Sequence, residues 1–146
     1  MMECDAKLLQ KAIDWASFAH EGQRDKVGMP YILHPLAVML SLPAYDVMGR
    51  IVAVLHDVIE DTGLTLEHLS KWLPPHLVEA IDAMSKRKGE ELETYWARVK
   101  ANPIALRVKR ADIAHNTSPE RLDMLDERTR ERLKKKYGKA LAFLNS

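Results

Sequence analysis

Four side chains capable of acid, base or metal chemistry lie close together in the middle of the chain. His56, Asp57, Glu60 and Asp61 share one side of a helix predicted over residues 46–61, at about 100° per residue. The opposite arc of that helix is apolar, with Met48, Ile51, Val52, Leu55, Val58 and Ile59. Carboxylates in the last turns of a helix oppose its macrodipole by about 0.3–1 kcal/mol each. We therefore expect a compensating cation, and a bound divalent metal would serve.

A second polar stripe is predicted on a later helix, over residues 103–117. Lys109, Asp112 and Asn116 follow one another at spacings of three and four, so they share one face of that helix. Asp112 has apolar neighbours on both sides in the sequence. A half-buried aspartate needs a partner, because burying an unpaired charge is costly.

Each stripe also has a simpler interpretation. Glu60 and Asp61 can be solvated residues beside a turn, and Asp112 can pair with Lys109 or Arg110 on a solvated face. Together with the imidazole of His34, which stands at the start of another predicted helix, the stripes favour a site of two imidazoles and two carboxylates. Such a set suits Mn²⁺, Fe²⁺ or Zn²⁺ and leaves positions open for water and substrate. Such a metal polarises a phosphate oxygen and lowers the pKa of bound water, and Glu60 or Asp61 would take the proton.

The elements that must position these residues are all predicted to be helices. Apolar residues recur at three- and four-residue spacing, and no alternating strand pattern is present. The first helix begins after Asp5 as its N-cap and ends near Gly22, and a loop follows over 23–31. A second helix is predicted to begin just after His34, with Pro35 at its first position. A third is predicted over 46–61, a fourth from the Thr65 cap through Trp72, and a fifth from Pro74–Pro75 to about Met84. The remaining helices are predicted over 90–101, over 103–117 and after Asp126. The chain is thus predicted to be one all-α domain, 1–146, of about eight helices.

Composition narrows the class of protein. Lys and Arg total 22 against 21 Asp and Glu, so no chain-wide basic field indicates a nucleic-acid partner. The single cysteine, Cys4, excludes an internal disulfide. No apolar run approaches the roughly 18 residues of a membrane span. We expect a soluble, cytoplasmic protein without nucleic-acid or membrane partners, and the sequence leaves its oligomeric state open.

Several motifs resemble the HD hydrolase domain of RelA/SpoT enzymes. The resemblance covers nearly the whole chain and rests on the strings Phe18-Ala-His-Glu-Gly-Gln23, Gly28-Met-Pro-Tyr-Ile-Leu-His-Pro35, Leu55-His-Asp-Val-Ile-Glu-Asp-Thr62 and Val108-Lys-Arg-Ala-Asp112, with Asn116 beyond. It implies an HD-type helical bundle. Because the 146 residues include no synthetase or regulatory domain, the nearest likeness is to the stand-alone small alarmone hydrolases related to metazoan SpoT homologues.

The resemblance also implies an activity and residue roles. The activity is removal of the 3'-pyrophosphate from guanosine tetra- and pentaphosphate, giving GDP or GTP, with Mn²⁺ as the usual metal and another divalent transition metal as the alternative. His34, His56, Asp57 and Asp112 would be the metal ligands. Glu60 and Asp61 would activate or position the attacking water, and Asn116 would contact the sugar or a phosphate of the nucleotide.

Contacts to the substrate are predicted around this core of residues. Arg24 and Lys26 flank Asp25 where long family members usually read Arg-Lys, which opens (p)ppApp or NADPH as alternative substrates. Further candidates are Lys109, Lys86 in the loop over 85–89, and Tyr137, whose spacing also suits a core position. A nucleotide-binding HD module without turnover is a further alternative. His20 is predicted to support a helix end, and His68, His76 and His115 receive no role.

Overall fold

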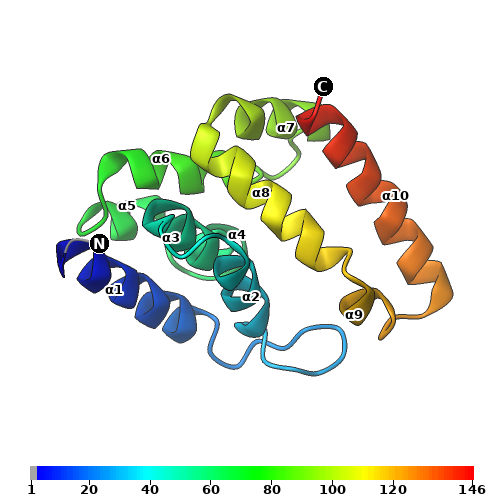
Figure 1. The fold of residues 1–146 in the computed structure, drawn as a ribbon, viewed down its shortest axis with the longest axis horizontal. Coiled ribbons are helices and arrows are strands. Elements are labelled where there is room, and N and C mark those ends of the chain that lie inside the picture. Colours follow the sequence, from blue (N-terminus) through cyan, green and yellow to red (C-terminus); the bar gives the residue numbers. More distant parts are fainter. Residues whose placement is uncertain (1–2) are drawn as a thin grey trace.

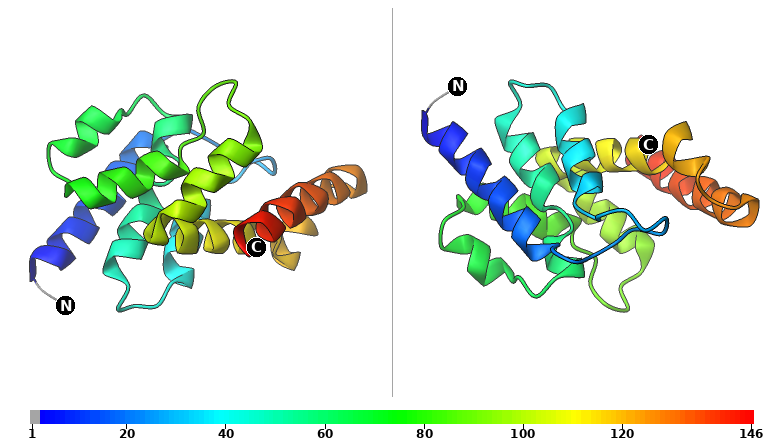
Figure 2. Two further views of the ribbon diagram at one scale, coloured as in Figure 1. Left: turned by 90° about the horizontal axis from the view of Figure 1, so that it is seen from above. Right: turned by 90° about the horizontal axis from the view of Figure 1, so that it is seen from below.

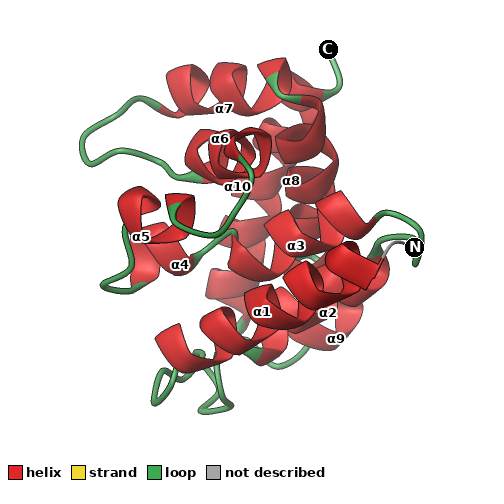
Figure 3. Cartoon of the chain, turned by 90° about the vertical axis from the view of Figure 1, so that its left-hand side faces the viewer, coloured by secondary structure: helices red, strands yellow, loops and turns green. Residues whose placement is uncertain are grey.

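The computed structural model describes residues 3–146, and within that range it contains helices and no strand (Figures 1 and 3). Arg24 and Pro30 form an isolated bridge in the loop after the first helix. The helices are α1 Glu3–Ala19, α2 Leu33–Ser41, α3 Val47–Leu55, α4 Val58–Asp61, α5 Leu66–Ser70, α6 Pro75–Met84, α7 Leu92–Ala101, α8 Pro103–Asn116, α9 Pro119–Leu122 and α10 Glu127–Leu144. The all-α prediction is confirmed.

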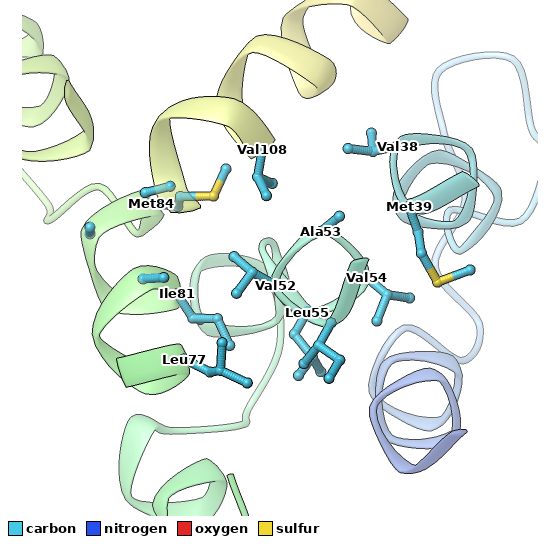
Figure 4. Packing of buried hydrophobic residues seen from close by; sticks show 14 of the residues in the cluster. Val38, Met39, Val52, Ala53, Val54, Leu55, Leu77, Ile81, Met84 and Val108 are labelled. Carbon is cyan, nitrogen blue, oxygen red and sulfur yellow. The ribbon is translucent and has the colours of Figure 1, made fainter. Parts of the chain in front are cut away.

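Helix α3 is the centre of the fold. It packs against α1, α2, α6 and α8, and Figure 4 shows Val52, Ala53 and Leu55 surrounded by side chains from α2, α6 and α8. The predicted apolar face is confirmed as core, since Ile51, Val52 and Leu55 are fully buried. The predicted polar arc does not lie opposite it, because α3 ends before His56 and buried residues also occupy its other sides. Met48 and Arg50 are the half-buried residues of α3, and His56, at its end, is only 3% exposed.

The N-terminus of α3 is fixed by a local cap. The Asp46 carboxylate accepts a hydrogen bond from the backbone N–H of Gly49 at 3.0 Å and pairs with Arg107 of α8 at 2.7 Å. A side chain at position 49 would collide with that carboxylate, because an added Cβ would lie 2.2 Å from its Oδ2. Asp46 and Gly49 therefore act together to start the central helix.

The predicted helix over 46–61 is interrupted at the two residues that carry the chemistry. Helix α3 ends at Leu55, and α4 begins at Val58. The ring Nδ1 of His56 bonds the carbonyl of Ala53 at 2.5 Å, which is the acceptor that Asp57 N–H would use in a continuous helix. Because that carbonyl is taken, the chain turns at His56–Asp57. Glu60 and Asp61 consequently lie on a short separate helix and not at the end of a long one.

Smaller differences concern helix ends. Asp5 lies within the first turn of α1, so it is not the N-cap. Helix α2 begins at Leu33, one residue before His34, and Pro35 is its third residue. Helix α9 was not predicted, because four residues are too few to show a periodic pattern. The Thr65 and Asp126 caps and the Pro75 start are confirmed.

Helices α7, α8 and α10 form the second half of the molecule. In Figures 1 and 2, α10 runs alongside α8 in the opposite direction, with α9 in the connection between them. No helix in residues 3–146 combines the length and apolar character needed to cross a bilayer. The polar residues converge where α8 packs against α2 and the end of α3.

Candidate metal centre and active site

Two imidazoles and two carboxylates from three parts of the fold meet at one point. Nε2 of His34, in α2, lies 2.8 Å from Oδ1 of Asp112, in α8. Nε2 of His56, at the end of α3, lies 3.1 Å from Oδ2 of Asp57 and 3.3 Å from Oδ1 of Asp112. Ligands of an ion with bonds of about 2.1 Å lie roughly 3.0–3.4 Å apart, so the two separations at His56 fit a shared cation. The His34–Asp112 pair is closer, at hydrogen-bonding distance.

His56 has the protonation pattern of a metal ligand. Its Nδ1–H donates to the Ala53 carbonyl, so the neutral imidazole carries its lone pair on Nε2. That Nε2 is buried and forms no well-directed hydrogen bond with any described residue, although two carboxylates lie close to it. A buried polar atom without a partner requires an explanation, and a bound metal supplies one.

Asp57 is held by a residue that the sequence analysis did not single out. The hydroxyl of Tyr31 donates to Oδ2 of Asp57 at 2.6 Å. Burial opposes ionisation of Asp57, but His56 and this hydrogen bond bring its pKa down to about 2. The carboxylate is therefore ionised at neutral pH, as metal binding requires.

Asp112 is the most heavily contacted member of the cluster. Its Oδ1 accepts from Asn116 at 3.1 Å as well as facing both histidines, and its Oδ2 pairs with Lys109 at 3.1 Å. Despite burial, Lys109 and His56 hold the pKa of Asp112 well below its ordinary value. The predicted stripe of Lys109, Asp112 and Asn116 is confirmed in its geometry.

The charge balance of the cluster favours a cation. Burial lowers the pKa of His56, but Asp57 and Asp112 outweigh it and raise that pKa well above its ordinary value. Protons on imidazole thus supply the positive charge when no metal is bound, and a divalent ion would take their place. The donor set, its spacing and its electrostatics therefore all fit a divalent metal.

His34 makes a second contact on its far side. Its Nδ1 lies 2.7 Å from Nδ1 of His115, in the last turn of α8. Burial lowers the pKa of His115 to about 4, so this imidazole is neutral at physiological pH. His115 received no role from the sequence because its spacing places it off the stripe of Lys109, Asp112 and Asn116, yet its ring contacts His34 of α2.

A pocket of about 440 Å³ opens beside the cluster. Its wall includes His34, Asp57, Glu60 and Asp112. The wall also includes a set of cationic side chains, here called the basic wall: Arg24, Lys26, Lys86, Lys109, Arg121 and Lys136. Leu92, Tyr95, Trp96, Met124 and Leu133 add an apolar surface. A cationic and apolar pocket next to a metal centre suits a phosphorylated ligand with a flat organic group.

The two candidate bases are placed differently. Glu60 lines the pocket, and its Oε1 accepts the backbone N–H of Lys86. Burial raises the pKa of Glu60. Asp61 is not part of the pocket wall, and its backbone carbonyl accepts from Gln23 at 2.7 Å. Glu60 is thus the better placed of the two carboxylates.

The structure brings all six predicted substrate contacts to the pocket wall: Arg24, Lys26, Lys86, Lys109, Asn116 and Tyr137. Lys109 and Asn116 are engaged with Asp112, so they also position a predicted ligand. Tyr137 lines the pocket and also packs on the core, so the predicted substrate contact and the predicted core position are compatible.

Four site residues were missed in the sequence analysis: Tyr31, His115, Arg121 and Lys136. Tyr31 and Arg121 lie in or near turns, where periodicity carries no information. Lys136 lies in a run of basic residues on α10, where spacing does not distinguish a side chain that lines a pocket from a solvated one. The one usable signal for Tyr31 was its place in the string from Gly28 to Pro35 that carries the family resemblance.

The fold and the paired His56-Asp57 define an HD-type helical domain. The structure matches that of a protein described as a metazoan ortholog of SpoT that hydrolyzes ppGpp and plays a role in starvation responses, with a TM-score of 0.80 and 22% identity over 94% of this chain and 85% of that one. No family model matches the chain.

Curated sequences give the more specific likeness. The chain is 32% identical over 125 residues to a probable GTP pyrophosphokinase of Mycobacterium leprae, covering 78% of this chain and 16% of that protein. It is 34% identical over 127 residues to the bifunctional (p)ppGpp synthase/hydrolase SpoT of Escherichia coli K12, covering 78% and 18%. The chain therefore spans less than a fifth of the length of these relatives. Sequence and fold together identify it as an HD domain of the RelA/SpoT type.

Proposed function

We propose that the chain is a metal-dependent phosphohydrolase that removes the 3'-pyrophosphate of guanosine tetra- and pentaphosphate, with residues 1–146 acting as one domain. The observation that carries this proposal is the unpartnered Nε2 of His56, which lies among two carboxylates and a second imidazole beside a cationic pocket. Relatives that carry the pyrophosphohydrolase name support the choice of substrate.

The metal would be held by His34, His56, Asp57 and Asp112, and we infer Mn²⁺ as the ion. When bound, it supplies a Lewis acid for a phosphate oxygen and lowers the pKa of a water molecule. The protein residues around it fix the ligands: Tyr31 holds Asp57, and Lys109 with Asn116 holds Asp112. The lone exposed cysteine, Cys4, suits the reducing cytosol that we infer as its location.

Glu60 would act as the general base. It faces the pocket, one of its oxygens is held by Lys86 N–H, and burial raises its pKa toward the range useful for proton transfer. Asp61, one residue further on, would assist by its charge, since it lies outside the pocket wall.

The basic wall would bind the phosphates of the substrate. Its six cationic side chains are opposed in the pocket by the acidic Asp25, Asp57, Glu60 and Asp112, two of which are the proposed metal ligands. Once the metal is counted, the pocket is strongly positive. A ligand with several phosphates, such as a nucleoside bearing two pyrophosphates, would neutralise this charge best.

The hydrogen bonds of Asp25 bear on how the pocket contacts the nucleotide. The Asp25 carboxylate accepts the backbone N–H groups of Val27 and Met29 at 3.0 and 2.9 Å. It is therefore occupied in shaping its own loop, which leaves Arg24 and Lys26 to meet the ligand. This suits a ligand with more than one phosphate. The choice of guanine follows the names of the relatives, and (p)ppApp and NADPH are retained as the alternatives to be compared directly.

Product analysis tests the proposal. Metal-free protein is supplied with Mn²⁺ and incubated separately with guanosine tetraphosphate, its adenosine analogue and NADPH, and pyrophosphate and orthophosphate are quantified. Pyrophosphate with GDP is the expected result. Orthophosphate from NADPH alone would replace the proposal with a phosphomonoesterase, and binding without any product would replace it with a nucleotide-binding module.

A further inference from the structure

The contact between His34 and His115 constrains where protons can lie. Their Nδ1 atoms are 2.7 Å apart, the ring centroids 5.0 Å, and the ring planes differ by 21°. That centroid separation is close to the Nδ1–Nδ1 distance plus two ring radii, so the rings lie nearly end to end in one plane. In this arrangement a proton on one nitrogen points at the lone pair of the other.

Only one of the two neutral arrangements suits a cation. With the proton on Nδ1 of His34 and a lone pair on Nδ1 of His115, Nε2 of His34 presents a lone pair to the cluster. With the proton on His115 instead, Nε2 of His34 carries a proton and donates to Asp112, 2.8 Å away. His115 must therefore be the acceptor whenever His34 binds a metal.

We propose that His115 is a positioning residue for the metal centre, which fixes the Nδ1-protonated form of His34 and the orientation of its ring. This inference rests on the metal site of the proposed function. It assigns to the two histidine ligands different acceptors: the Ala53 backbone carbonyl for His56 and a side chain for His34. The His115 side chain can be changed by mutation, whereas the Ala53 backbone carbonyl cannot.

The location of His115 fits this role. It lies in the last turn of α8, three residues beyond Asp112, and so α8 carries both a predicted ligand and the support for a ligand on α2. Ser118 binds the backbone carbonyl of His115 through both its N–H and its hydroxyl, at 3.1 and 2.8 Å. The backbone of His115 is therefore held at the end of α8 by contacts that do not involve a metal.

Three variants test the proposal by metal binding, with no use of activity. His115→Asn keeps an acceptor oxygen near the position of Nδ1, His115→Phe keeps the ring and removes the acceptor, and His76→Phe removes an exposed imidazole from α6 as a control. Each metal-free protein is titrated with Mn²⁺ by calorimetry, and its melting temperature without metal is recorded. We expect His115→Phe to lose about 10–100-fold in affinity, and His115→Asn and His76→Phe to stay within about 3-fold of the native protein.

A spectroscopic measurement addresses the tautomer itself. In ¹⁵N-labelled protein loaded with Zn²⁺, which is diamagnetic, the imidazole nitrogen shifts of His34 report the site of protonation. Protonation at Nδ1 in the native protein is expected, and Nδ1 of His115 should show the shift of an acceptor.

The outcomes separate the two proposals. Equal Mn²⁺ affinity in the native, Phe and Asn proteins would overturn the role of His115 and leave the metal site intact. Equal weakening in the Phe and Asn variants, with lower melting temperatures for both metal-free proteins, would likewise overturn it, since a packing defect would then explain the loss. Failure of the native protein to bind Mn²⁺ or Zn²⁺ would overturn both proposals.

Discussion

Nε2 of His34 lies 2.8 Å from Oδ1 of Asp112, although 78 residues separate them in the sequence. This contact joins α2 to α8 across the pocket, and His56 from α3 lies beside it. Three helices are therefore held at one point by groups that would share a metal, so metal binding and folding stability should be linked.

The first prediction is a metal-dependent gain in stability. At a free Mn²⁺ concentration 100 times the dissociation constant, the gain is about 2.7 kcal/mol, which corresponds to a rise in melting temperature of roughly 5–10 °C for a chain of this size. Thermal denaturation followed by circular dichroism, with and without chelator, measures it. Asp112→Asn is the matched control, because it keeps the side-chain shape and should abolish the rise.

The second prediction concerns Glu60 as a base. Glu60→Gln keeps an oxygen that can accept Lys86 N–H but cannot take a proton, so kcat should fall by about 10²–10⁴-fold while Mn²⁺ affinity changes little. Because burial raises the pKa of Glu60, activity of the native enzyme should fall as the pH drops through that raised pKa. The variant should lack this acid limb. Native-like kcat in Glu60→Gln would assign the base elsewhere, with Asp61 the next residue to test.

The third prediction concerns the hydroxyl of Tyr31. Tyr31→Phe removes the 2.6 Å hydrogen bond to Asp57 and keeps the ring. Mn²⁺ affinity should fall by about 10-fold, and the metal-free protein should lose about 1–2 kcal/mol. Calorimetry and urea denaturation provide the two values. Tyr45→Phe serves as the control, because Tyr45 is 86% exposed; equal effects in both variants would remove Tyr31 from the site.

The fourth prediction concerns stability away from the pocket, at Asp46. Asp46→Ala removes the cap of α3 and should cost about 1–2 kcal/mol, whereas Asp46→Asn can still cap and should cost less. The hydrogen bond from Arg107 holds the pKa of Asp46 below its ordinary value. Its charge therefore adds stability that is present above an unfolded-state pKa of about 3.9 and is lost as the pH falls through the lower folded-state pKa.

Urea denaturation at pH 7 and at steps below about pH 4 tests both parts of this prediction. The difference in unfolding free energy between native protein and Asp46→Asn should shrink as the pH falls below about 3.9. A difference that is constant with pH would mean that the Arg107–Asp46 pair contributes nothing through its charge.

The sequence was informative where periodicity and caps act locally. The three-four spacing of α8 placed Lys109, Asp112 and Asn116 on one stripe, and the capping residues Thr65 and Asp126 were correctly located. The all-α fold followed from the same periodicity. The motifs that resemble the RelA/SpoT family contain all four proposed ligands, His34, His56, Asp57 and Asp112.

Tertiary interactions account for the differences. The break at His56–Asp57 depends on a ring-to-backbone hydrogen bond that helical periodicity does not encode. Burial of α3 on all sides depends on four partners, and the pairing of His115 with His34 depends on how α2 meets α8. Asp25 lines the pocket, and its carboxylate also accepts two backbone N–H groups of its own loop, which the sequence alone does not reveal.

The most direct test of the central claim combines metal occupancy with turnover in one titration. Mn²⁺ is added stepwise to metal-free protein, and the initial rate of pyrophosphate release from guanosine tetraphosphate is compared with calorimetric binding, for the native protein and Asp57→Ala. The account predicts that the rate rises in proportion to occupancy of one site and that Asp57→Ala shows neither binding nor turnover. Pyrophosphate release by the metal-free protein, or by Asp57→Ala at the native rate, would contradict it.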